Sequence, residues 1–156
     1  SQAFNLAEQK WESIVRGDLP DVVVPNVGTI DDLVINVVLA SIDGPGGVLG
    51  STNIDVARTG TFLPALATIT IDSADLDSLS TNGALTDVAL HEFAHALGFG
   101  TVWTDQRLIA RSTSPSVVAF GTVASNTKPR IRNAPTQTST GIQVRCTAPT
   151  VQCSGG

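Results

Sequence analysis

Two histidines and the glutamate between them form the group with the clearest chemical potential: His91, Glu92 and His95, in the stretch HEFAHALGFG. On a helix, residues four apart project from one face, one turn above the other, so two imidazoles at this spacing can hold one cation. Glu92 lies about 100° further round the helix axis than His91, which places a carboxylate beside that cation. Neutral imidazoles are common zinc ligands, and a nearby glutamate can take a proton from zinc-activated water. The stretch predicts a zinc site with His91 and His95 as ligands and Glu92 as general base.

The same five-residue pattern also arises by chance, as ordinary polar side chains on the surface of a helix. Three features favour zinc. These histidines are the only two in the chain, β-rich segments precede them, and Gly98 follows at a position where a helix can reverse. We therefore expect Zn²⁺ as cofactor, and a peptide or protein as the substrate whose amide bond is attacked.

The helix that carries this group is expected over residues 84–97, ending at Gly98. Apolar residues occupy one side of it, which favours packing against a sheet while the histidines face a cleft. These apolar residues are Leu85, Val88, Ala89, Phe93, Ala96 and Leu97.

The remaining elements must hold that helix in place. Helical spacing of apolar residues predicts an amphipathic helix over 3–16. Residues 33–43 are rich in β-branched side chains and long enough for a buried strand, and residues 66–72 alternate as a strand with two different faces does. From residue 112 onward the sequence turns to Ser, Thr, Pro, Asn and Gln without a period, which predicts loops and short strands.

Two further segments resemble ligand motifs only superficially. The glycine-rich stretch from Gly44 is expected to be a loop, and it lacks the spacing of a phosphate-binding motif. Asp72, Asp75 and Asp77 lack the glycine and terminal glutamate of a calcium loop. We expect a short helix over 74–79 instead, capped by Ser73 and with Asp75 in its first turn.

Composition limits the class of protein. A chain of 156 residues is near the size of one domain, and its net charge of −5 argues against nucleic acid as a partner. No apolar run approaches the roughly 20 residues that cross a bilayer, so no transmembrane segment is expected, and the N-terminus does not read as a signal peptide. Cys146 and Cys153 suit a short-loop disulfide, with metal ligation as the alternative. A disulfide fits a secreted protein.

The active-site stretch and its surroundings resemble a known family, the metzincin metalloproteases, and in particular the bacterial relatives of leishmanolysin. The segments that carry the likeness occur in the same order, from about Trp11 to Asp105: WESIVRGDLPD, IDGPGGVLG, ITIDSADLDSL and LHEFAHALGFGTVW. The resemblance implies an α+β fold in which a mixed twisted sheet packs on the N-terminal helix and the active-site helix. It also implies an edge strand above the cleft that pairs with an extended peptide substrate. Residues 1–111 would form the catalytic subdomain and 112–156 an irregular or divergent C-terminal segment of the same domain.

The sequence departs from the family at the third zinc ligand. Most metzincins place a histidine six residues after the second one, where this chain has Thr101, and no histidine, glutamate or methionine follows. The ordinary zinc-ligand side chains after His95 are Asp105, Cys146 and Cys153. Asp105 lies nearest, whereas a cysteine would more plausibly block a hydrolytic site. Our preferred explanation is a truncated, divergent or foreign C-terminal part, with Asp105 as third ligand the second choice.

Two functions follow from these observations. The first is a zinc-dependent endopeptidase with Glu92 as general base. The second is a catalytically impaired binding module that keeps the metzincin scaffold, holds zinc weakly in an incomplete site and binds peptide. In a third interpretation the histidines are ordinary surface residues. Measuring the metal content of the protein separates this interpretation from the other two.

Overall fold

The computed structural model describes residues 2–108 and the strand 142–146. Along the chain the elements are α1 (Gln2–Ile14), β1 (Val22–Val24), β2 (Gly28–Ile30), β3 (Leu33–Ala40), β4 (Gly50–Ala57), β5 (Pro64–Asp72), α2 (Leu76–Thr81), α3 (Leu85–Ala96) and β6 (Ile142–Cys146). The fold is α+β, as predicted. The boundary expected at residue 111, most of the segment 112–156 and the cysteine pairing lie outside the described residues.

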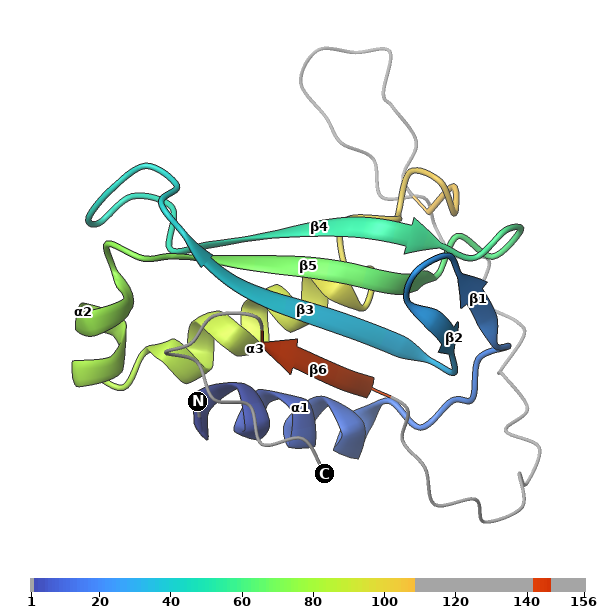
Figure 1. Ribbon diagram of the computed structural model, residues 1–156, viewed down its shortest axis with the longest axis horizontal. Coiled ribbons are helices and arrows are strands. Elements are labelled where there is room, and N and C mark those ends of the chain that lie inside the picture. The colour runs from blue at the N-terminus through green and yellow to red at the C-terminus, as the bar shows by residue number, and fades with distance from the viewer. Residues whose placement is uncertain (1, 109–141, 147–156) are drawn as a thin grey trace.

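A four-stranded mixed sheet carries the architecture, with the strand order β4-β5-β3-β6 (Figure 1). β3 runs parallel to both β5 and β6, whereas β4 runs antiparallel to β5. Within the described residues β4 is therefore an edge strand, with one side of its backbone unpaired. α1 and α3 lie against each other, and α3 also contacts β4 and β5.

The main core lies between these two helices and the sheet. Ile69 and Ile71 of β5, with Ile35 and Val37 of β3, present fully buried side chains to the helices. Phe93 of α3 meets Phe4 of α1 with ring centroids 6.4 Å apart and the planes at 39°. The alternation predicted for β5 is confirmed, because Thr68 and Thr70 on its other face are only partly buried.

The β1–β2 hairpin covers one end of the opposite sheet face. Val24 and Ile30 from the hairpin pack there on Val34 and Leu66 of the sheet. A buried guanidinium fixes the adjoining turns, because Arg58, only 5% exposed, donates to the backbone carbonyls of Asp31, Asp32, Pro20 and Pro64. Four backbone acceptors thus satisfy a charge that would be costly to bury unpaired.

Carboxylates organise the loop that leads into β4. Asp72 is fully buried, and one of its oxygens accepts hydrogen bonds from the backbone N–H groups of Ile42, Asp43 and Gly44. Its other oxygen accepts the N–H of Ala74. These bonds, that of Ala74 foremost and that of Asp43 next, hold the pKa of the Asp72 carboxyl below its usual value.

The capping predicted for α2 is wrong. Asp75, not Ser73, occupies the N-cap position, and no side chain caps the helix there. Asp75 is instead turned towards the loop, where its Oδ1 accepts the N–H of Gly46, while its Oδ2 is buried without a hydrogen-bond partner among the described residues. Asp72 and Asp75 thus hold the backbone of the glycine-rich loop, and neither caps α2 with its side chain.

The elements that the sequence did not predict are β1, β2 and β4. β1 and β2 lie between the helix expected over 3–16 and the strand expected from residue 33, and β4 follows the predicted glycine-rich loop without a strong apolar run. In β4 the outward side chains are Ser51, Asn53 and Asp55, while the inward ones, Thr52, Ile54 and Val56, are only half buried. This two-residue alternation is typical of a half-buried strand, and the sequence analysis did not use it.

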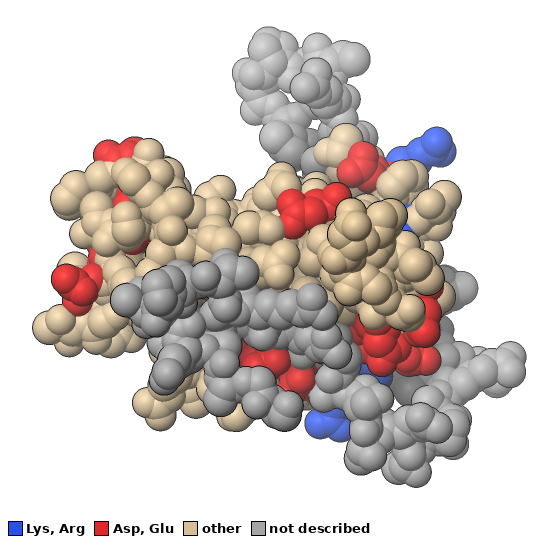
Figure 2. Space-filling view, viewed as in Figure 1, with Lys and Arg blue, Asp and Glu red and all other residues tan. Residues whose placement is uncertain are grey.

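The acidic side chains and the helix lengths bear on two expectations. The described residues hold all 14 acidic side chains of the chain, and Figure 2 shows several of them spread over one face, with few basic ones. The expectation that nucleic acid is not a partner stays a prediction. Among the described helices none has the length and apolarity needed to cross a membrane, as expected.

Candidate metal centre

The helix that carries His91 and His95 ends in a glycine turn that matters for the site. Gly98 has a φ of 105°, a conformation that side chains rarely adopt. Its N–H bonds to the carbonyl of His95 at 3.0 Å, and the N–H of Phe99 bonds to that of Ala94 at 2.9 Å. This pair of bonds is the Schellman motif, and it folds the chain back so that Phe99 lies over the last turn of α3.

The two imidazoles converge on one point. Their Nε2 atoms are 3.1 Å apart, the ring centroids are 4.7 Å apart, and the rings are nearly perpendicular at 81°. Two Zn–N bonds of about 2.0–2.1 Å at a tetrahedral angle would separate the nitrogens by roughly 3.3–3.4 Å. A shift of a few tenths of an ångström, about the freedom of one χ angle, brings the pair to that spacing.

A backbone carbonyl selects the tautomer of one histidine. Nδ1 of His95 lies 2.7 Å from the carbonyl oxygen of Phe99, which can only accept, so Nδ1 carries the proton. Nε2 of His95 then presents a lone pair to His91. Two lone pairs facing each other at 3.1 Å would repel, so either the Nε2 proton of His91 or a cation must lie between them. This donor set fits Zn²⁺, which neutral imidazole nitrogens bind.

Glu92 lines the same pocket as His91, and it lies deeper than expected. Its side chain is 6% exposed, because it lies between α3 and the first residues of β4 instead of on the open face with the histidines. Thr52 of β4 donates its hydroxyl proton to Oε2 of Glu92 over 2.6 Å, and Oε1 is left without such a bond. Gly50 supplies the space: a Cβ there would lie 3.1 Å from Cγ and 3.2 Å from Oε1 of Glu92.

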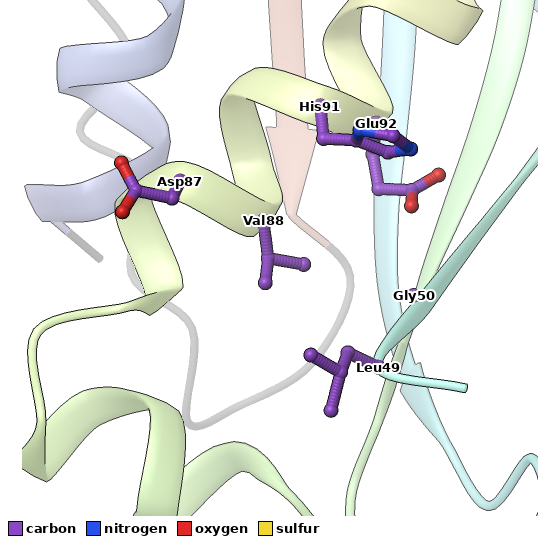
Figure 3. A pocket seen from close by; sticks show the side chains of 6 residues that line it. All are labelled: Leu49, Gly50, Asp87, Val88, His91 and Glu92. Carbon is purple, nitrogen blue, oxygen red and sulfur yellow. The ribbon is translucent and has the colours of Figure 1, made fainter. Parts of the chain in front are cut away.

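A pocket of about 430 Å³ opens beside these groups, lined by Leu49, Gly50, Asp87, Val88, His91 and Glu92. In Figure 3 the ring of His91 and the carboxylate of Glu92 lie side by side at one end, and Leu49 and Val88 form an apolar wall. Asp87 lies at the far rim and points away from the histidine. The pocket thus joins the imidazole pair to the beginning of the edge strand.

The structure does not bring Asp105 to the histidines: His91, His95 and Asp105 do not form a group whose ligand atoms all lie within 4.8 Å of one another. Two contacts fix the path of the chain after Gly98. Val102 is buried, and the Gln106 side chain donates to the carbonyl of Thr61. Asp105 is left exposed. The side chains of Cys146 and Cys153 lie outside the described residues.

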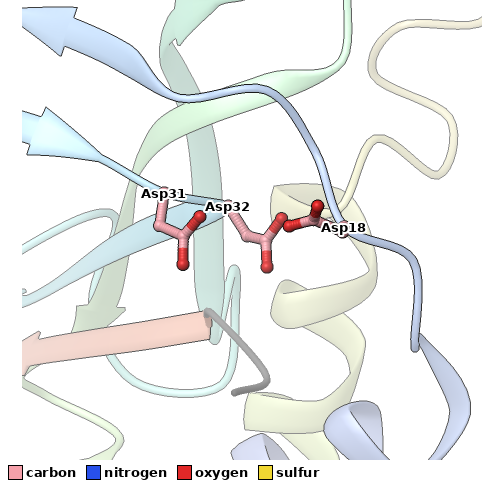
Figure 4. Close-up of side chains that lie close together, drawn as sticks. All are labelled: Asp18, Asp31 and Asp32. Atoms are coloured by element: carbon pink, nitrogen blue, oxygen red, sulfur yellow. The ribbon is translucent and has the colours of Figure 1, made fainter. Parts of the chain in front are cut away.

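Among the described residues, one group does meet that distance criterion: Asp18, Asp31 and Asp32, at the other end of the sheet (Figure 4). Asp32 accepts the N–H of Leu19 at 2.6 Å. The negative charge of Asp32 raises the pKa of Asp31, and partial burial, Asp21 and Asp18 add to it. The sequence analysis did not single out this group, and exposed acids gather in this way without a ligand.

Sequence reasoning also missed the residues that support the centre. Thr52 and Gly50 had no visible role because β4 was not predicted. The glycine turn was expected, but the distance between the Phe99 carbonyl and the His95 ring is a tertiary detail with no pattern in the sequence.

The chain was compared with protein-family models, curated proteins and solved structures, and no match was found.

Proposed function

We propose that this chain is a zinc-dependent endopeptidase of the metzincin type, exported from the cell. The observation that carries the proposal is the convergence of two Nε2 atoms to 3.1 Å beside a buried glutamate. The same separation suits a hydrogen bond between the two imidazoles, and the buried carboxylate beside them is what favours the metal site. The mixed sheet, with its antiparallel edge strand next to the helix pair, agrees with the family resemblance.

Each residue would have a defined task in this reaction. His91 and His95 would hold the zinc ion, which supplies Lewis acidity and makes a coordinated water a stronger acid. Glu92 would accept a proton at Oε1, the oxygen that Thr52 leaves free, and later deliver it to the leaving amine. The low exposure of Glu92 limits competition from bulk water.

The edge strand supports the choice of an extended peptide as substrate. β4 has one unpaired side in the described residues and begins at the pocket next to Glu92. A peptide that adds to a sheet edge gains backbone hydrogen bonds that do not depend on its sequence. Pairing along β4 would carry an amide bond past the imidazole pair.

A second function is favoured by one specific observation, the absence of a third protein ligand near the pair among the described residues. Zinc held by two imidazoles alone would bind less tightly and less rigidly. The chain would then be a metzincin-scaffold peptide-binding module with an incomplete zinc site. Asp105 completes the site only if residues 101–107 rearrange.

Metal analysis and peptide hydrolysis separate these functions. Purified protein is loaded with Zn²⁺, dialysed, and assayed on a fluorogenic peptide library. The endopeptidase predicts close to one zinc per chain, turnover by the wild type, and loss of turnover with retained zinc in Glu92→Gln. Asp77→Asn, an exposed carboxylate in α2, is the matched control. Zinc and peptide binding without turnover identify the binding module, and wild-type zinc content equal to that of His91→Ala removes both.

A further inference from the structure

We propose that Trp11 of α1 is a positioning residue for the metal centre, and that it acts on both sides of the imidazole pair. The inference rests on the proposed zinc site. Trp11 lies 80 positions before His91 in the chain, and the inference is that it increases the affinity of the site for zinc.

Trp11 contacts the two backbone positions that flank the histidines. Its Nε1–H donates to the carbonyl oxygen of Leu90 over 3.1 Å, at the residue immediately before His91. Its ring also packs on the ring of Phe99, with centroids 5.6 Å apart and the planes at 43°. Phe99 is the residue whose carbonyl accepts the proton on Nδ1 of His95.

The second contact is the important one. The carbonyl of Phe99 must stay within hydrogen-bond reach of His95 to keep Nε2 of that ring unprotonated and aimed at the ion. The backbone N–H of Phe99 is held by the carbonyl of Ala94, and its side chain, 50% exposed, packs on the ring of Trp11. The Trp11 ring therefore restrains the turn that selects the tautomer, while its N–H restrains the turn of α3 that presents His91.

A purely structural role for Trp11 makes a different prediction. The fully buried contacts between α1 and α3 belong to Phe4, Ala7 and Phe93, whereas Trp11, nearer the other end of α1, packs against the edge of this core and is only partly buried. Conservative changes at Trp11 should therefore spare the fold and disturb the site. Outer partners of metal-bound histidines typically contribute about 10–100-fold to metal affinity.

Two variants separate the two contacts. Trp11→Phe removes the N–H that Leu90 accepts and keeps an aromatic ring, and Phe99→Leu removes the ring contact and keeps the carbonyl. Ile14→Ala, an exposed apolar residue one turn further along α1, is the matched control. Zinc affinity is measured by competition with a chromophoric chelator, unfolding by denaturant, and the imidazole tautomers of the metal-free proteins by ¹⁵N NMR.

We expect about a tenfold loss of zinc affinity in Trp11→Phe and Phe99→Leu, with unfolding midpoints close to that of Ile14→Ala. In NMR spectra of the metal-free protein, His95 should carry its proton on Nδ1 in the wild type and in Trp11→Phe, which keeps an aromatic ring against Phe99, and become a mixture of tautomers in Phe99→Leu. Unchanged affinity in both variants and an unchanged tautomer in Phe99→Leu overturn the role of Trp11 while the proposed function stands. If the wild type binds no zinc, the proposed function fails, and the tautomer in Phe99→Leu alone then decides whether the ring contact with Trp11 positions His95.

Discussion

Adding one methyl group at Gly50 should impair proton transfer without removing the metal. In Gly50→Ala the new Cβ would lie 3.1 Å from Cγ, 3.2 Å from Oε1 and 3.3 Å from Cδ of Glu92. Carbon atoms in contact prefer about 3.5–4.0 Å, so the carboxylate must retreat by roughly 0.3–0.7 Å. No positive φ is recorded for Gly50, so alanine itself causes no backbone strain there.

The size of the effect follows from that displacement. A misplacement of about 1 Å can cost roughly 100-fold in rate, so a retreat of about half that distance should lower kcat about tenfold. Overpacking typically costs about 1–3 kcal/mol, and a loss near 1 kcal/mol is expected because the end of a flexible side chain can yield. The zinc content should not change.

The assay is steady-state peptide hydrolysis together with zinc analysis and denaturant unfolding. Gly17→Ala is the matched control, because a Cβ at Gly17 meets nothing within 4 Å. If Gly50→Ala hydrolyses peptide as fast as Gly17→Ala does, the reasoning about Glu92 is refuted. Loss of zinc in Gly50→Ala would equally refute it, since the imidazoles are not touched by that methyl group.

Three further changes test other contacts. Thr52→Val removes the hydroxyl that donates to Glu92, and we expect kcat to fall several-fold with KM and zinc content unchanged; an unchanged kcat would mean that the bond does not orient the base. Phe93→Ala should lower the free energy of unfolding by about 3–5 kcal/mol in denaturant titrations, because the ring is fully buried, and a loss below 1 kcal/mol would contradict this. The pKa of Asp72 is lowered in the fold, so its contribution to stability is complete at neutral pH and is lost as the pH falls below about 4. Asp72→Asn should lower stability at neutral pH and flatten this acid dependence, and an unchanged pH profile would contradict the assignment.

The pairing of His91 with His95 on one helix face and the elements with strong periods could be predicted from the sequence. The helix around His91 was expected over 84–97 and forms α3, and the expected strands formed as β3 and β5. These segments bury a continuous apolar face, so their period directly reports their environment. Gly98 was also assigned correctly, because few residues other than glycine adopt its backbone conformation.

The parts of the centre that depend on tertiary contacts could not be predicted. β4 does alternate β-branched and polar residues from Ser51 to Val56, a signal that the sequence analysis did not use, and Thr52 therefore had no assigned neighbour. Glu92 is buried because β4 approaches α3 closely at Gly50. Nothing in the sequence around Gly50 indicates this approach. Asp105 was chosen by its distance along the chain, whereas Val102 and Gln106 determine where that turn lies.

Glu92 and the histidines are supported by different parts of the molecule. The carboxylate depends on Gly50 and Thr52 in the edge strand, whereas the imidazole pair depends on the glycine turn. Natural or engineered descendants of this chain can therefore lose one capacity and retain the other. Substitutions in β4 would leave the proposed cation site without its proposed base. Substitutions in the glycine turn would leave Glu92 oriented but without the cation whose water it would deprotonate.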